Sequence, residues 1–210
     1  MSETLVDPTV SKRKFEREVE NYRRIEGDYI LRGVWMVKAS WPEVFVVFGA
    51  PHLKPPAVVF GAVVDFANYD FWAPSVRLVD PFTREPYKWK DLPSKLPRMI
   101  PGAFPQEIAQ QIGGLDPHAA ALWTAQNSAH QPLMQGQPDE IPFLCIPGVR
   151  EYHEHPAHTG DSWLLHRGAG EGTLFFILDQ LWKYGVQGVA SYNCQLAISI
   201  NGFAPKLGIQ

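Results

Sequence analysis

The sequence predicts an α+β fold in which a single domain, residues 1–210, combines an antiparallel sheet with a helix before it and a helix after it. Three observations predict this fold. An amphipathic segment comes first, segments rich in Val, Phe, Tyr and Trp follow between Pro and Gly residues, and a strongly apolar helical segment comes late in the chain. The middle segments are typical of antiparallel strands, and strands grouped between helices indicate the α+β class.

Composition excludes several classes of protein. With 210 residues, 45% hydrophobic content and a net charge of -3, the chain has enough apolar material for one sizeable core. A slightly acidic chain is not expected to bind nucleic acid, because that affinity comes largely from basic side chains on phosphates. Its apolar runs are far shorter than a bilayer span, and its first residues lack the pattern of a secretory signal. Two cysteines in different local settings predict no disulfide framework, so we expect a cytoplasmic protein.

The first elements follow from hydrophobic spacing. Between Ser11 and Ile25, apolar residues recur at helical intervals among charged ones, and Ser11 is a suitable cap. This predicts an amphipathic first helix. The next three apolar segments predict consecutive antiparallel strands. These expected strands are Ile30 to Lys38, Trp41 to Phe48 and Val58 to Phe66.

Proline shapes the middle of the chain. The stretch Tyr69 to Pro81 is an aromatic and proline corner, which predicts a rigid turn into a short fourth strand. Residues 82–142 are proline-rich and less periodic, so we interpret them as an inserted segment that covers the sheet, with one helix near His118 to Gln126.

The end of the chain returns to regular patterns. Thr173 to Tyr184 is predicted to be a buried helix, because apolar residues nearly surround it, with Thr173 as its cap and Gly185 as its end. Gln195 to Ile200 predicts a last strand. Cys194 lies in an apolar, strand-like context that indicates a structural role.

The chemically densest part of the sequence is the run from Cys145 to Trp163, Cys-Ile-Pro-Gly-Val-Arg-Glu-Tyr-His-Glu-His-Pro-Ala-His-Thr-Gly-Asp-Ser-Trp. Thiol and imidazole groups bind transition metals and carry out proton or acyl transfer near neutral pH. The functional site is therefore expected here. The remaining histidines have no supporting cluster, although His166-Arg167 follows the run closely enough to line its pocket; they are His52, His118, His130 and His166.

Two parts of the sequence resemble known families. Tyr69-Asp70-Phe71-Trp72-Ala73-Pro74-Ser75-Val76 is similar to the Tyr-Pro-Phe-x-Pro-Pro-x-Val motif that precedes the active-site cysteine of ubiquitin-conjugating enzymes. Cys145-x-x-Gly148-x-Arg150-Glu151-Tyr152-His153-x-His155-Pro156-x-His158-x-Gly160-Asp161 resembles the bacterial CEHH family of predicted metal-binding domains. The resemblance implies a ubiquitin-conjugating-enzyme-like fold. It also implies a place beside ubiquitin-like modifiers and activating enzymes in bacterial conjugation, with a role in antiphage defence.

The chain departs from ordinary conjugating enzymes in two ways. The His-Pro-Asn tripeptide before the cysteine is absent, since the His-Pro pair here, His155-Pro156, follows Cys145. The segment between the proline corner and Cys145 is also longer than usual. An active site would therefore be built differently.

The residues allow two mechanisms that compete for one sulfur. In the first, the Cys145 thiolate accepts the C-terminal acyl group of a modifier from an activating enzyme and passes it to an amine of a protein or other target. A nearby histidine or Arg150 would lower the pKa of the thiol, and a histidine or carboxylate, with Asp161 as one candidate, would take the proton of the amine. In the second, Cys145 is a ligand of zinc in a non-catalytic adaptor of the same pathway.

The zinc ligands can be chosen by geometry if residues 153–155 are extended. His153 and His155 then share one face with Glu151, which favours Glu151 over Glu154 as a ligand or base. Pro156 would break the strand and let His158 return to the same centre. In the adaptor, zinc would be held by Cys145, one of Glu151 or Glu154, and two of the three histidines, so the expected metal residues are Glu151, His153, His155 and His158, with Cys145 added. A metal-dependent hydrolase is a third hypothesis.

Overall fold

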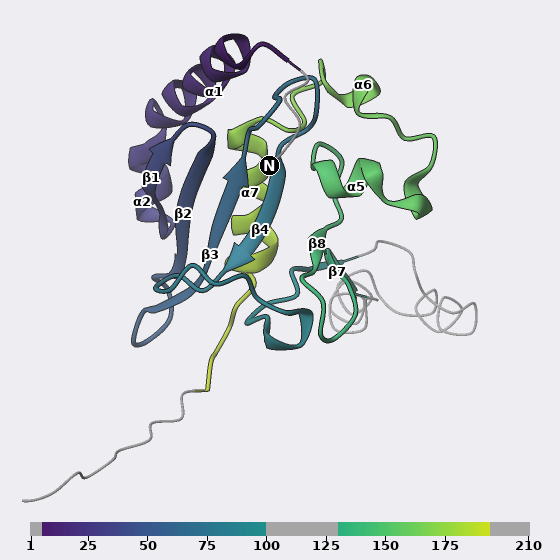
Figure 1. Cartoon of the computed structure of the whole chain (residues 1–210). Helices are drawn as coiled ribbons and strands as arrows, with labels where there is room; N and C mark the ends of the chain where they lie inside the picture. The colour runs from purple at the N-terminus through teal and green to yellow at the C-terminus, as the bar shows by residue number, and fades with distance from the viewer. Residues whose placement is uncertain (1–5, 100–129, 194–210) are drawn as a thin grey trace, which may run out of the picture.

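The computed structural model describes residues 6–99 and 130–193, and it has the expected α+β architecture (Figure 1). Four antiparallel strands form a sheet in the order β1-β2-β3-β4. They are β1 (Val34–Ser40), β2 (Glu43–Ala50), β3 (Ala57–Asp65) and β4 (Ser75–Val79). All four predicted strands are therefore present, although the first begins at Val34 and not at Ile30. The predicted strand Gln195 to Ile200 lies outside the described residues, as does Cys194.

The first predicted helix is confirmed as α1 (Pro8–Arg23), but its cap is different. Asp7 accepts a hydrogen bond from the Thr9 amide, whereas Ser11 lies inside the helix and is buried. A second helix, α2 (Glu26–Leu31), occupies the expected start of the first strand. The prediction of a strand from Ile30 was wrong because Ile30 and Leu31 close this helical turn and are exposed.

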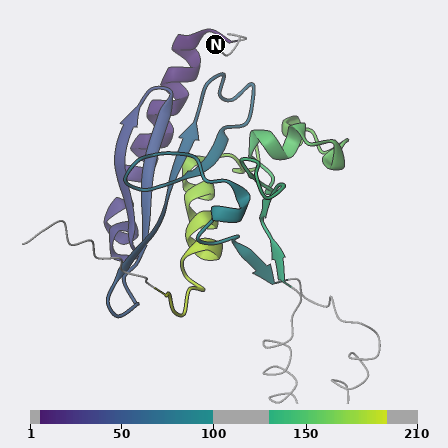
Figure 2. The same ribbon diagram turned by 60° about the horizontal axis from the view of Figure 1, so that its bottom comes forward.

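One face of the sheet carries the core. Alternate residues of β3 point to that face, and Phe60, Ala62 and Val64 are fully buried. Both α1 and the last helix, α7 (Leu174–Gly185), cover it: Phe15 of α1 packs edge-on against Phe66, and Gly185 of α7 lies against Phe60. Figures 1 and 2 show the two helices on this side of the sheet. The helix predicted over Thr173 to Tyr184 is confirmed as α7. Its predicted cap is confirmed too, since the Thr173 side chain accepts a hydrogen bond from the Phe176 amide.

The proline-rich segment supplies short paired strands and part of the core. Its described parts contain the 3-10 helix η1 (Trp89–Asp91), β5 (Pro97–Met99) paired with β6 (His130–Pro132), and β7 (Met134–Gln135). β7 pairs with β8 (Phe143–Leu144), which directly follows the segment. Leu96, Leu133 and Met134 are buried in the main core. The segment thus packs as part of the domain as far as it is described. The predicted helix His118 to Gln126 falls within residues 100–129, outside the described ranges.

The cysteine-bearing loop leaves the end of β8 and returns to the sheet before α7. It contains α5 (Arg150–Glu154), the 3-10 helix η2 (Pro156–His158) and α6 (Trp163–His166). Figure 1 shows these green elements beside β4. No helix among residues 6–99 and 130–193 has the length and apolar character needed to cross a membrane.

Candidate functional site around Cys145

Cys145 lies directly after β8 in a fixed backbone position. Its amide donates a 2.7 Å hydrogen bond to the carbonyl of Leu133, and only 9% of the residue is exposed. The Sγ atom lies 3.3 Å from Nε2 of His158. The structure therefore pairs the predicted nucleophile with one histidine of the motif.

The backbone around the histidines is helical, so the expected extended geometry of residues 153–155 was wrong. Arg150 begins α5 and fixes it to the proline corner, since its guanidinium donates to the carbonyls of Ala67 and Ala73 at 2.7 and 3.1 Å. Pro156 then starts η2, where its fixed φ is suited to a first helical position. The Arg150 contacts join parts of the chain about 80 residues apart. The stretch therefore forms two short helices, although its sequence is typical of a loop.

His153 has a structural role in this arrangement. Its Nδ1 lies 2.8 Å from the carbonyl oxygen of Asp161 and must donate, while its Nε2 accepts a hydrogen bond from the Gly148 amide at 3.0 Å. A neutral ring satisfies both bonds, and burial lowers the pKa of His153, which agrees with this state. Both ring nitrogens are occupied, so His153 is not free to bind a metal.

The other predicted metal residues point to different places. Glu151 accepts a hydrogen bond from the Ser75 hydroxyl on β4. Nδ1 of His155 accepts from the Ala157 amide at 3.2 Å, and the ring stacks on Phe143 with centroids 4.7 Å apart. In the part of the chain that the structure describes, no three His, Cys, Asp or Glu side chains are grouped so that they could hold a metal. Cys145 and His158 alone of the expected set are brought together, and the residues as placed do not fit a four-ligand zinc site.

Asp161 belongs to a series of hydrogen-bonded side chains next to Cys145 and His158. Its Oδ2 accepts from the Tyr152 hydroxyl at 2.5 Å, and its Oδ1 lies 2.5 Å from Nε2 of His166. The other ring nitrogen of His166 is bonded to Glu171. The Tyr152 ring in turn stacks on His158, with centroids 4.0 Å apart and planes 28° from parallel. The Asp161 side chain is thus connected to His158 through Tyr152, and the Asp161 amide also donates a 3.0 Å hydrogen bond to the His158 carbonyl.

His166 was missed by the sequence analysis, which found no cluster around it. It lies between two carboxylates, and both contacts need a ring nitrogen that donates, so the imidazolium form satisfies them. Its hydrogen bond to Asp161 raises the pKa of His166, and the same bond lowers the pKa of Asp161. The signal in the sequence was the equal spacing of Asp161, His166 and Glu171, five residues apart.

The thiol is held in a protonated state by its surroundings. Burial raises the pKa of Cys145, while the charge of Arg98 on β5 opposes this effect. Arg150, which the sequence suggested for this role, is tied to the carbonyls of the proline corner and stacks on Trp72 at 5.1 Å. A base beside the sulfur is therefore needed to form the thiolate near neutral pH.

The pKa values of His166 and His153 should differ in opposite directions from the ordinary value of about 6.5. We expect the pKa of His166 to lie above it and that of His153 below it, measured from the pH dependence of ring proton chemical shifts by NMR. Because the folded-state pKa of His166 is raised, its stabilising contacts are present at lower pH and are lost as pH rises through that pKa. His166→Gln should remove this alkaline loss of stability, and equal titration of the two rings would contradict the assignment.

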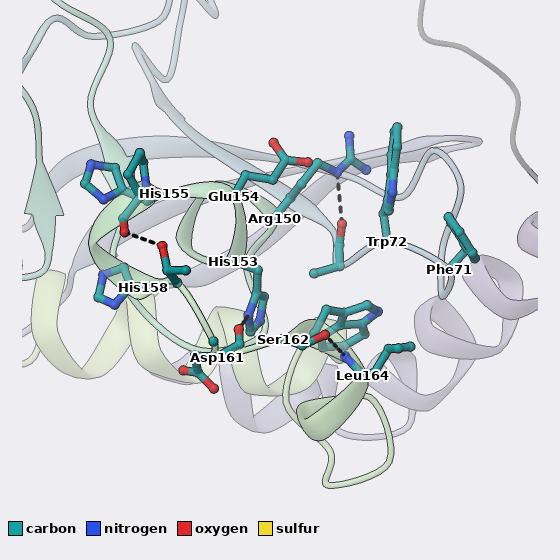
Figure 3. A pocket seen from close by; sticks show the side chains of 15 residues that line it. Phe71, Trp72, Arg150, His153, Glu154, His155, His158, Asp161, Ser162 and Leu164 are labelled. Carbon is teal, nitrogen blue, oxygen red and sulfur yellow. Dashed lines mark hydrogen bonds between the residues drawn. The ribbon is translucent and has the colours of Figure 1, made fainter.

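A pocket of about 520 Å³ opens beside Cys145 and His158, and His158 forms part of its wall. Figure 3 shows His155 and His158 on one side, Trp72 and Phe71 on the other, and Asp161, Ser162 and Leu164 along the near edge. Trp163, whose indole donates a 2.9 Å hydrogen bond to the Asp70 carbonyl, is the buried part of this wall. A cavity of this size, with apolar walls and a few polar groups, is typical of a ligand site.

The comparisons with known proteins cover the sheet, the cysteine-bearing loop and α7. The model of the Y4jH family, described as Y4jH-like, matches residues 6–189. A curated relative from Sinorhizobium fredii (strain NBRC 101917 / NGR234), described as "Uncharacterized protein y4jH", is 39% identical over 199 residues, which are 94% of this chain and 92% of the relative.

Proposed function

This chain belongs to the Y4jH-like family, and we propose that it is a cysteine-dependent acyl transferase that acts as a conjugating enzyme for a ubiquitin-like modifier. The observation that carries the proposal is the 3.3 Å contact between Cys145 Sγ and His158 Nε2. A buried thiol beside an imidazole is the arrangement that nucleophilic acyl transfer requires. The identity of the acyl group comes from the resemblance of the motif to bacterial conjugation proteins.

The first step loads the cysteine. His158 takes the thiol proton, and the Cys145 thiolate attacks the thioester carbonyl that joins the modifier to its activating enzyme. A new C–S bond forms on Cys145, the old C–S bond breaks, and the proton passes to the departing thiolate of the activating enzyme. Exchange between thioesters is nearly balanced in energy, so the protein needs to supply position and a base rather than a driving force.

The second step unloads the cysteine onto an amine. The neutral amine attacks the Cys145 thioester, a C–N bond forms and the C–S bond breaks. His158 accepts the one proton that the amine nitrogen loses as the C–N bond forms, and it passes this proton to the Cys145 sulfur, which leaves as the thiolate. The product is an amide between modifier and target.

His158 is a better candidate for the base than Asp161. The carboxylate of Asp161 already accepts hydrogen bonds on both oxygens, and the bond from His166 lowers its pKa, which makes it a weak base. His158 touches the sulfur directly. We therefore propose that Asp161 contributes to the reaction through Tyr152, which stacks on His158, and takes no proton itself.

The order of elements supports a ubiquitin-conjugating-enzyme-like fold. A first helix, a four-stranded antiparallel meander, an aromatic and proline corner, a cysteine and a last helix follow one another as the resemblance implies. We propose a cytoplasmic reaction with an activating enzyme, a modifier and a protein or other amine target as partners. A role in antiphage defence follows from the same resemblance.

A loading experiment tests the proposal. The full chain is incubated with the activating enzyme, the modifier and ATP from the same conjugation system, and the products are separated without reductant. We expect an adduct that thiols remove and that is absent in Cys145→Ala. Cys194→Ser is the matched control, because it removes the second of the two cysteines and should leave the adduct unchanged.

Two other outcomes would contradict the transferase. If no adduct forms and the protein contains stoichiometric zinc that Cys145→Ala loses, the chain is the metal-bound adaptor. If metal is present and the protein cleaves a bond with water, it is a hydrolase. Circular dichroism of each variant shows whether a lost adduct reflects lost chemistry or a lost fold.

A further inference from the structure

We propose that the pocket beside Cys145 binds a primary alkylammonium group, so that it is the acceptor site from which the target amine attacks the thioester. This inference rests on the proposed transferase for its role in the reaction, whereas the binding itself can be measured without any transfer. The proposed ligand is a cation with an apolar stem. The occupant is either a free small amine or a lysine side chain of a protein.

The position of the pocket fits an acceptor. His158 forms part of its wall and also touches Cys145. A bound alkylammonium first loses one proton to water, and the neutral amine then lies next to His158, which takes the second proton as the C–N bond forms. The cysteine is itself 9% exposed, so an attacking nucleophile must approach through a defined opening. The volume of about 520 Å³ is ample for a four- or five-carbon amine.

The charges around the pocket favour a cation. Arg150 keeps its positive charge, but its guanidinium is directed to the carbonyls of Ala67 and Ala73 and to the Trp72 ring, and among the described residues it makes no ion pair with Glu154. Asp161 is balanced by the imidazolium of His166. Glu154 is exposed, lines the pocket, and its side chain makes no hydrogen bond or ion pair with any part of the chain that the structure describes. Its carboxylate is therefore the charge that a bound ligand would compensate.

The apolar walls fit the stem of such a ligand. Phe71 is 50% exposed and Leu164 is 69% exposed, although both are large apolar residues that normally pack inside a protein. With Trp72 and Trp163 they make up the apolar part of the lining of the pocket that Glu154 also lines. Alkyl carbons gain from contact with such a surface, and an ammonium group is attracted to aromatic faces as well as to a carboxylate.

Binding is tested by isothermal titration of the full chain with three probes of similar length. The probes are 1-aminopentane, the neutral 1-pentanol and the anionic hexanoate. We expect the amine to bind most tightly, and Glu154→Gln to weaken it by about three- to five-fold, the effect of one exposed ion pair. Glu85→Gln removes an exposed carboxylate that does not line the pocket, and it should leave binding unchanged.

The source of the amine is distinguished with peptides. A peptide containing lysine that binds more tightly than free 1-aminopentane, and that loses this advantage when its lysine is acetylated, indicates a protein target. Tighter binding of the free amine indicates a small-molecule target. Equal binding of alcohol and amine, tighter binding of hexanoate, or no binding at all would overturn the proposal. If amine binding is found but no Cys145 adduct ever forms, the pocket assignment stands and the transferase fails.

Discussion

Replacing His158 by glutamine should lower the rate of acyl transfer through Cys145 by about 10²- to 10⁴-fold, the usual contribution of a general base. Glutamine keeps a polar group near the sulfur but cannot take its proton at neutral pH. Because burial raises the pKa of Cys145, few thiolates exist without that base. The measurement is the single-turnover rate of adduct formation and of its discharge to lysine.

The pH dependence separates loss of a base from loss of structure. The variant should recover as pH rises, about tenfold per unit, until the thiol itself ionises, whereas a misfolded variant would stay inactive. His155→Gln is the matched control, because His155 lines the same pocket but stacks on Phe143 and does not touch the cysteine. Equal losses in the two variants, or none in His158→Gln, would show that His158 is not the base.

Local signals were enough to predict most of the fold. The sheet and both long helices could be predicted because their apolar residues follow regular intervals, and the Thr173 cap of α7 is a short-range feature, whereas the cap expected for α1 at Ser11 was wrong. Segments whose conformation depends on distant partners were not predictable. The helix α5 has five residues, too few to be stable alone, and it is anchored when Arg150 binds carbonyls of the proline corner.

The sequence located the candidate site but could not assign roles within it. Composition alone marks residues 145–163 as reactive. Which histidine contacts the sulfur depends on backbone groups. The Gly148 amide and the Asp161 carbonyl are hydrogen-bonded to the two ring nitrogens of His153, and the Ala157 amide is hydrogen-bonded to Nδ1 of His155. Only the folded loop leaves His158 beside Cys145. His166 was missed because its importance lies in two carboxylates that the chain brings together by turning around it.

The second large effect is expected from Gly148→Ala, which should lower the free energy of unfolding by about 2–4 kcal/mol. Gly148 has φ +88, a conformation that costs an alanine about 1–2 kcal/mol. A Cβ atom there would lie 2.2 Å from the Gly172 amide nitrogen, a backbone atom that cannot move aside without displacing the start of α7. The loss is measured from urea unfolding followed by circular dichroism.

A matched control isolates the steric part of this effect. Gly160 also has positive φ, +98, but nothing lies within 4 Å of an added Cβ, so Gly160→Ala should cost only the backbone strain, about 1–2 kcal/mol. The difference between the two variants then measures how tightly the cysteine loop packs on the segment before α7. The segment before α7 also contains Glu171, which is hydrogen-bonded to His166. Any folded Gly148→Ala protein should therefore show a lower pKa for His166 by NMR, and an unchanged value would show that the two loops are not coupled.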